Sequence, residues 1–354
     1  MFPGKHRARV RPAAVSNRRR RPRVVGNVGP VQLTWRNGLE EAEAAEVVAL
    51  LAEAERTDSV APAGEHVFLR LKAHRNVVDQ IEPVQADVAG SEHFLVRESS
   101  GELAGYAHLD TEHEEDDGLL VAELAVRPQH RRQGVGAQLV GRLLERAELP
   151  AEVDAAGGAG ADTGRLRIWS HGEHPGALRL AERFGFGRPR ELWRMGLELA
   201  EAELPDVELP PGVTIRAFRP GKDEADVVRV NHRAFSWHPE QGDMTEADLV
   251  EKQREDWFDP AGFLLAVDSG DEVLGFHWTK VHPDGTGEVY VVGVDPDTRG
   301  NGLGRSLTVA GLRYLRDTGR SRVMLYVEAD NAPAIAIYRR LGFRKWDTDV
   351  QFGR

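Results

Sequence analysis

The sequence predicts an α/β (or α+β) protein with a mixed sheet, built from two tandem copies of one domain. The main observation is an internal repeat. Leu124–Pro128 is followed by a glycine loop at Arg131–Gly136, and both blocks recur 168 residues later as Val292–Pro296 and Arg299–Gly304. Two more pairs of blocks flank these in the same order, so the chain contains a duplicated unit of about 150 residues.

Each copy has the same predicted order of strands, glycine loop, helix, strand and short helix. Runs rich in β-branched and aromatic residues predict strands at 94–97, 105–109, 122–126, 263–268, 275–281 and 288–294. Apolar residues at helical spacing predict helices at Val135–Arg146 and Leu303–Leu315. A further strand follows at 165–170 and at 323–328, and each copy then has a short helix ending at a Gly-Phe turn. This alternation predicts helices layered on a sheet.

The repeat and its flanks divide the chain into four expected segments. These are a basic tail at 1–30, a first domain at 31–199, a proline-marked linker at 200–212 and a second domain at 213–354. A Gly/Ala-rich surface loop at 152–164 is expected only in the first domain.

The tail carries Lys5 and eight arginines with no acidic residue, which leaves −20 for the rest of a chain whose net charge is −11. A basic arm could bind nucleic acid, but this tail has no periodicity and the rest of the chain is acidic. A disordered extension is therefore the favoured interpretation of the tail, and we expect no nucleic-acid partner.

Composition excludes several classes of protein. The chain has no cysteine, which excludes disulfides, thiolate metal sites and cysteine nucleophiles. It has no run near the ~20 apolar residues of a membrane span. We expect a cytoplasmic, monomeric protein that needs neither a metal nor a membrane.

The repeated glycine loop lies between a strand and a helix, a context that suits phosphate binding. Glycines let the backbone turn tightly, and the free N–H groups at the helix start point to one spot where an anion can bind. A Walker A loop would need Gly-Lys-Ser/Thr, which this loop lacks, and a dinucleotide fold would place the glycines after its first strand. The structural alternative is a packing turn, but its recurrence in both copies favours a phosphate site.

Two segments of the second copy, Val294–Gly304 and Asn331–Phe343, resemble the acetyl-CoA motifs of the GNAT N-acetyltransferase superfamily. The resemblance implies acetyl-CoA as acetyl donor, one per copy, with the pantetheine arm along Val292–Val294 and the pyrophosphate on the loop. In the first copy the implied acetyl-CoA positions are Leu124, Ala125, Val126, Arg132, Gln133, Gly134, Val135, Gly136 and Ala137. In the second they are Val292, Gly293, Val294, Arg299, Gly300, Asn301, Gly302, Leu303, Gly304, Arg305, Asn331, Ala332, Pro333, Ala334, Ile335 and Ala336.

Acetylation of an amine needs a base for the incoming ammonium and an acid for the departing thiolate. Glu288 is the candidate base, because alternation along the strand places it on one face with Tyr290 and Val292. Tyr338, one helical turn before Gly342, is the candidate acid. The structural alternatives are a surface carboxylate on an edge strand and a core aromatic residue.

The first copy lacks both candidates. At the offsets of the repeat, Leu120 stands for Glu288 and Ala181 stands for Tyr338, so we expect this copy to bind acetyl-CoA without catalysing transfer. Glu123 is a substitute base in principle, but alternation places it on the opposite face.

Longer segments resemble the actinobacterial mycothiol synthase family of tandem GNAT enzymes. They are residues 60–65, 238–242, 275–282, 287–294 and 325–331. This resemblance implies acetylation of the cysteinyl amine of 1D-myo-inositol 2-(L-cysteinylamino)-2-deoxy-glucopyranoside, the last step of mycothiol biosynthesis. The substrate-binding positions that it implies are Glu65, Glu240, Lys280, Glu288 and Tyr326.

Other interpretations stay open at this point. Glu65 could be an acid at a helix start, Lys280 a solvated strand residue and Tyr326 a sheet aromatic. The chain could also acetylate another small amine or a peptide N-terminus, or could sense acetyl-CoA without catalysis.

Overall fold

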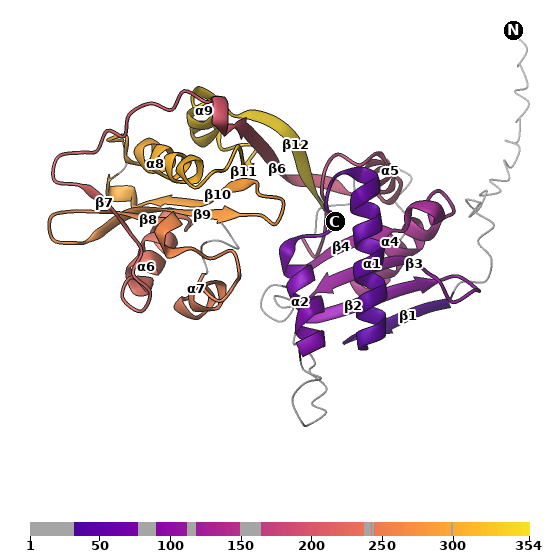
Figure 1. Ribbon diagram of the computed structural model, residues 1–354. Coiled ribbons are helices and arrows are strands. Elements are labelled where there is room, and N and C mark those ends of the chain that lie inside the picture. The colour runs from indigo at the N-terminus through magenta and orange to yellow at the C-terminus, as the bar shows by residue number, and fades with distance from the viewer. Residues whose placement is uncertain are drawn as a thin grey trace, which may run out of the picture.

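The computed structural model describes residues 32–76, 90–111, 118–148, 164–236, 242, 244–298 and 300–354. Their strands form one 12-stranded mixed sheet in the order β1-β2-β3-β4-β5-β12-β6-β11-β10-β9-β8-β7 (Figure 1). The predicted tail at 1–30 lies outside the described residues, as does nearly all of the loop at 152–164.

Every predicted strand and helix is present, and further elements lie before and after them in each half. The strands are β1 (Gln32–Arg36), β2 (Ser91–Arg97), β3 (Leu103–Asp110), β4 (Leu120–Val126), β5 (Leu166–Ser170), β6 (Gly187–Glu198), β7 (Thr214–Ala217), β8 (Phe263–Val267), β9 (Val273–Val281), β10 (Gly287–Val294), β11 (Arg322–Glu328) and β12 (Arg344–Gly353). The helices are α1 (Glu41–Asp58), α2 (Glu65–Asn76), α4 (Val135–Arg146), α5 (Pro175–Phe184), α6 (Glu224–Ala234), α7 (Glu246–Lys252), α8 (Leu303–Asp317) and α9 (Ala332–Arg340). The two predicted long helices are confirmed, and α8 runs two residues further than expected.

The two halves exchange their last strands. β6, which ends the first half, pairs with β11 of the second, while β12, which ends the chain, pairs with β5 of the first. β6 and β12 also pair with each other and bridge the two halves in Figure 1. The sheet is therefore continuous, and residues from either half can meet near β6 and β12.

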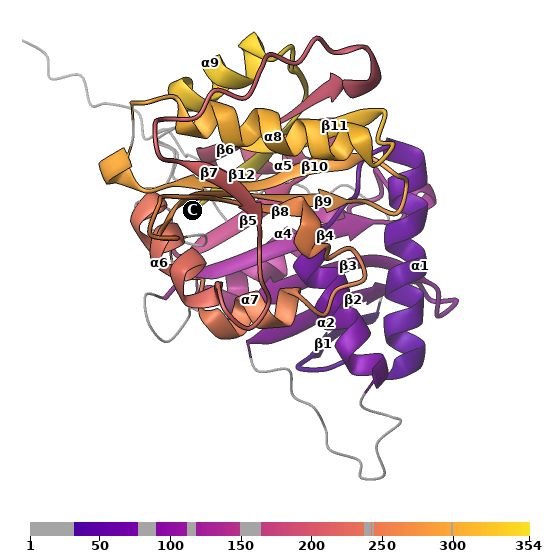
Figure 2. The same ribbon diagram turned by 60° about the vertical axis from the view of Figure 1, so that its left-hand side comes forward.

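Helices cover both faces of the sheet in the second half. Figure 2 shows α8 and α9 above the strands and α6 and α7 below them. Val309 and Leu312 of α8 pack with Val289 on one face, and Val227 of α6 packs with Trp278 on the other. These are called below the α8–α9 face and the α6–α7 face. In the first half, α1 and α2 cover the face that corresponds to the α6–α7 face.

The contact between β9 and α8 depends on a missing side chain. His277 is fully buried, and its ring nitrogen Nδ1 lies 2.8 Å from the Leu307 carbonyl oxygen. A Cβ atom at Gly311, one turn further along α8, would overlap the imidazole ring. Burial lowers the pKa of His277 to about 4, so the ring is neutral at pH 7.

We expect Gly311→Ala to lower the free energy of unfolding by about 1–3 kcal/mol, because overpacking forces the ring or the helix to move. The matched control is Gly141→Ala in α4, where a Cβ would meet open space. That change should raise the free energy of unfolding by about 0.5–1 kcal/mol. Urea denaturation measures both, and equal shifts in the two variants would contradict the packing argument.

Candidate active site

β10 and β11 part in the middle of the second half. Their parallel pairing is limited to Gly287–Val323 and Glu288–Met324, whereas β10 continues to Val294 with only β9 beside it. Within the described sheet, the β11-facing edge of Val292–Val294 therefore has no strand partner. Backbone N–H and C=O groups at such an opening can pair with an extended ligand.

A β-bulge lies where the strands part. The register between β10 and β9 shifts between Val289 and Val291, so Tyr290 and Val291 both pack on the α6–α7 face. Val292 packs with Val289 on the α8–α9 face instead. The prediction that Glu288 and Tyr290 share a face is confirmed, but the prediction for Val292 is wrong, because the bulge interrupts the alternation.

Glu288 is buried at this parting point. Its Oε2 lies 2.7 Å from Nε2 of His282, and its partner across the β9–β10 ladder is Lys280. The carboxylate is thus held on the α6–α7 face beside the open edge of β10. A carboxylate held in this way can accept a proton from an amine that approaches on this face.

Tyr338 lies on the other side of the same strand. It packs with Val289 and Val292 on the α8–α9 face, and its ring centroid is 5.7 Å from that of Phe343. Burial raises the pKa of Tyr338 to about 12, so the phenol keeps its proton at neutral pH. Among the described residues, no hydrogen-bond partner occupies the hydroxyl. A base and an acid therefore flank the opening from opposite faces of β10.

Lys280 joins the two halves. Its Nζ donates to both oxygens of Glu65, the first residue of α2, at 2.7 and 2.6 Å. The ammonium also lies 4.6 Å from the ring centroid of Trp257 and 5.2 Å from that of Tyr290. Only 6% of the Lys280 side chain is exposed, so it is not a solvated strand residue. The structure thus brings Glu65, Lys280 and Glu288 to one place, as the sequence predicted.

The remaining predicted substrate residues have different outcomes. Tyr326 lies on the same face as Glu288, because Met324 pairs with Glu288 and alternation carries two residues further along β11. Its side chain is exposed. Glu240 lies outside the described residues, and so does Arg299 of the glycine loop.

The two glycine loops share one backbone shape. In the second half Gly300 and Gly302 have φ values of 89° and 83°, and α8 begins directly afterwards. In the first half the same positions are Arg132 and Gly134, with φ values of 64° and 94°. A left-handed conformation is uncommon for an arginine, so the fold keeps this loop shape despite the changed residue.

The first-half loop borders a cavity of ≈820 Å³. The lining includes the predicted acetyl-CoA positions of this half except Gln133 and Val135. The Gln133 side chain bonds the Gln129 carbonyl, and Val135 is a core residue. Arg132, Arg179 and Arg183 also line the cavity. Its size and cationic wall suit a phosphorylated ligand of moderate size.

The first half corrects the predicted counterpart of Glu288. β4 pairs with β3 without a bulge. Asp110 of β3 corresponds to Lys280 of β9, and its ladder partner is Val121, whereas the ladder partner of Lys280 is Glu288. The counterpart is therefore Val121 and not Leu120. By alternation Glu123 shares the face of Val121, so the prediction that it faces the other way is also wrong. The extra residue in the β10 bulge shifts the correspondence between β10 and β4 by one residue on the N-terminal side of the bulge.

Glu123 is nevertheless engaged in a buried network. Its Oε2 accepts from the Gly64 amide at 2.6 Å, and its Oε1 lies 3.4 Å from Nε2 of His171. Nδ1 of His171 lies 2.9 Å from Asp349 of β12. Burial opposes the charge, but the bonds to Asp349 and Glu123 raise the pKa of His171 to about 10. His171 and Asp349 could not be predicted as site residues from the sequence, because only strand exchange brings Asp349 into the first half.

Known proteins share this architecture. The Acetyltransferase (GNAT) family matches residues 228–343, and the Acetyltransferase (GNAT) domain matches residues 90–188. A GCN5-related N-acetyltransferase from Sphaerobacter thermophilus aligns over 91% of this chain and 95% of its own, with a TM-score of 0.63 and 25% identity. A tandem GNAT protein from the clavulanic acid biosynthesis pathway covers 92% of this chain and 98% of its own, with a TM-score of 0.65 and 19% identity. Fold and site therefore define a tandem GNAT acetyltransferase.

Curated relatives narrow this class. The mycothiol acetyltransferase of Saccharopolyspora erythraea is 74% identical over 307 residues, which cover 87% of this chain and 100% of that protein. That of Actinosynnema mirum is 54% identical over 90% of this chain and 98% of its own. The chain belongs to the mycothiol acetyltransferase family. It is an acyltransferase whose activity is acetyl transfer in mycothiol biosynthesis, with acetyl-CoA as donor.

No helix among the described residues has both the length and the hydropathy that a membrane crossing requires. No group of three or more His, Cys, Asp or Glu side chains there is arranged to hold a metal ion.

Proposed function

We propose that this chain acetylates the cysteinyl amine of 1D-myo-inositol 2-(L-cysteinylamino)-2-deoxy-glucopyranoside. The observation that carries the proposal is the cluster of Glu65, Lys280 and Glu288, which spans both halves. The acceptor has one ammonium group and many hydroxyls. Carboxylates accept from both kinds of group, and a lysine ammonium donates to hydroxyl or carbonyl oxygens. A site that needs Glu65 makes the first half necessary for acceptor binding.

In this reaction the amine nitrogen forms a bond to the thioester carbon, and the carbon–sulfur bond breaks. Glu288 takes the proton that the ammonium must lose, and the hydrogen bond with His282 orients its carboxylate. Tyr338 gives its phenolic proton to the departing sulfur. The open edge of Val292–Val294 holds the pantetheine amides, and the loop from Gly300 to Arg305 holds the pyrophosphate.

The test is direct. Purified protein is incubated with acetyl-CoA and this cysteinyl acceptor, while thiol release and product mass are followed. N-acetylated acceptor is the expected product. A peptide with a free N-terminus and an aminoglycoside serve as alternative acceptors, and preferential acetylation of either would overturn the proposal. Binding of acetyl-CoA without turnover of any amine would favour a sensor.

We also propose that each half binds one acetyl-CoA and that only the second half transfers its acetyl group. Calorimetric titration with CoA is expected to give two sites per chain. Gly134→Val and Gly302→Val each place a β-branched residue at a left-handed φ, so each should remove one site. Only Gly302→Val should abolish turnover. A single site in the wild-type protein would refute the first-half site.

A further inference from the structure

Residues from four strands line up in one row across the sheet on the α6–α7 face. Lys280 of β9, Glu288 of β10, Met324 of β11 and Gly196 of β6 are successive partners in register, without a bulge between them. Neighbouring strands lie about 4.8 Å apart, so Gly196 is about 10 Å from Glu288 across the sheet. The glycine leaves a bare patch of backbone in this row.

The patch is covered by an aromatic ring from the end of the chain. β12 bulges between Lys345 and Asp347, and the bulged residue is Trp346. Its Cδ2, Cε2 and Cζ2 atoms lie where a Cβ of Gly196 would be, so the indole rests directly on the β6 backbone. Any larger residue at 196 would displace the ring.

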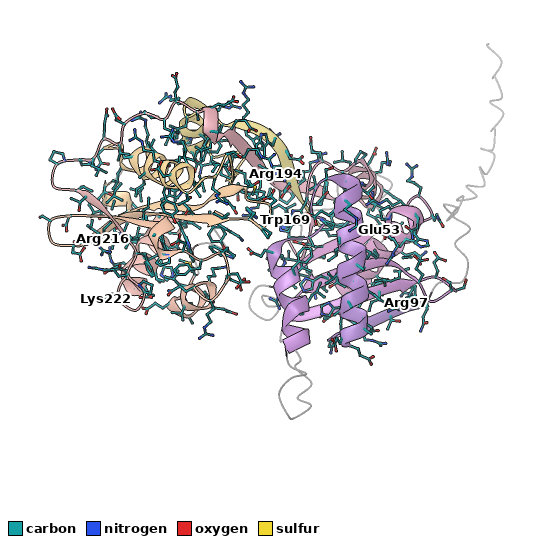
Figure 3. The ribbon with its side chains drawn as sticks, viewed as in Figure 1. Glu53, Arg97, Trp169, Arg194, Arg216 and Lys222 are labelled. Atoms are coloured by element: carbon teal, nitrogen blue, oxygen red, sulfur yellow. The ribbon has the colours of Figure 1, made fainter. Side chains whose placement is uncertain are left out.

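Trp346 remains 42% exposed although one side of its ring is covered. A tryptophan that is fixed on backbone and open on its other side is a platform for stacking. Polar groups lie beside it in the next row of the same face, where Arg194 of β6 is 3.6 Å from Asp347 and opposite Tyr326. Figure 3 places Arg194 at the junction of the two halves.

This combination of groups fits one ligand chemistry. A pyranose or cyclitol ring has an apolar face of C–H groups and an edge of hydroxyls. The C–H face packs on indole, while a guanidinium and a carboxylate bond the hydroxyls. The separation of about 10 Å from Glu288 leaves room for a cysteinyl group between the reacting amine and the ring.

We propose that Trp346, seated on Gly196, is a stacking subsite for the hydroxylated six-membered ring of the acceptor, with Arg194, Asp347 and Tyr326 as its polar rim. The inference rests on the proposed function, since it assumes a cysteinyl acceptor that carries such rings. It adds a specificity element from β12, which the two halves share.

The experiment compares an acceptor that carries the two rings with one that carries neither. One is the cysteinyl-glucosaminyl-inositol compound, and the other is L-cysteinamide, which has the same amine and no ring. Trp346→Ala should lower kcat/KM for the ring acceptor roughly 3- to 10-fold. It should leave kcat/KM for cysteinamide and KM for acetyl-CoA unchanged. Trp346→Phe should restore part of the loss, and Gly196→Ala should reproduce it.

The matched control is Trp193→Phe, because Trp193 lies on the opposite face of β6 beside Lys345. It should not change the preference between the acceptors. An equal loss on both acceptors in Trp346→Ala would show a structural role and overturn the subsite, and so would no loss on the ring acceptor. Cysteinyl-glucosamine, which lacks the inositol, tells which ring stacks. Failure of the wild type to acetylate the ring acceptor would refute the proposed function, and this subsite with it.

Discussion

Replacing Glu288 with glutamine should lower kcat by about 10²- to 10⁴-fold, the usual contribution of a general base. The amide has the same shape and can still accept a hydrogen bond from His282, but it cannot take a proton from the ammonium. The KM for acetyl-CoA should not change, because Glu288 is not expected to contact the nucleotide or the pantetheine arm. Steady-state kinetics with the cysteinyl acceptor measure both constants.

The pH profile separates this role from a structural one. An α-amine has an unperturbed pKa of about 8, so a higher pH supplies the free amine without a base. The deficit of Glu288→Gln should therefore shrink as the pH rises through this range. Glu272→Gln removes an exposed carboxylate and serves as control. A constant deficit, or a kcat close to that of the wild type, would argue against Glu288 as base.

The strands and long helices next to each glycine loop could be predicted from the sequence to within about three residues, whereas α1, α2, α6, α7, β1, β6, β7 and β12 were not predicted. α4 and α8 begin where the glycine loops end, because a left-handed glycine at the N-cap and an apolar stripe mark the start of each helix. The repeat also identified both loops as equivalent, and the structure gives them the same backbone shape.

Long-range features could not be predicted in the same way. A bulge adds one residue to one strand of a pair, and no periodicity in β10 marks it, so the counterpart of Glu288 was placed at Leu120 and not at Val121. Strand exchange depends on which strands β12 pairs with, and several hydrophobic strands of this chain are suitable partners. Asp349 beside His171 and Trp346 on Gly196 both follow from that choice.

The cluster around Glu65 and Lys280 could be predicted only in part. The residues were predicted from their resemblance to a family, but the direct ion pair between the halves could not be read from the sequence. The pair forms because the start of α2 in the first half lies next to β9 in the second half. Only tertiary packing determines that contact.

Replacing Tyr338 with phenylalanine should lower kcat by about 10²-fold or more, because the departing thiolate loses its proton donor. The ring should still pack with Val289, Val292 and Phe343, so the change removes one hydroxyl and little else. Circular dichroism and thermal unfolding should match the wild type. The KM values for both substrates should stay within a few-fold.

The control is Tyr314→Phe, which removes a partly exposed phenol of α8 that lies beside Gly262 and bonds Asp259. It should affect stability more than kcat. Because burial raises the pKa of Tyr338 to about 12, the acid form persists throughout the range in which the protein is assayed. The wild-type rate should therefore show no alkaline limb that belongs to Tyr338. If such a limb appeared near neutral pH and vanished in Tyr338→Phe, the phenol would be less buried than its packing indicates. Equal rates in Tyr338→Phe and the wild type would leave protonation of the thiolate to solvent and reduce Tyr338 to a core residue of α9.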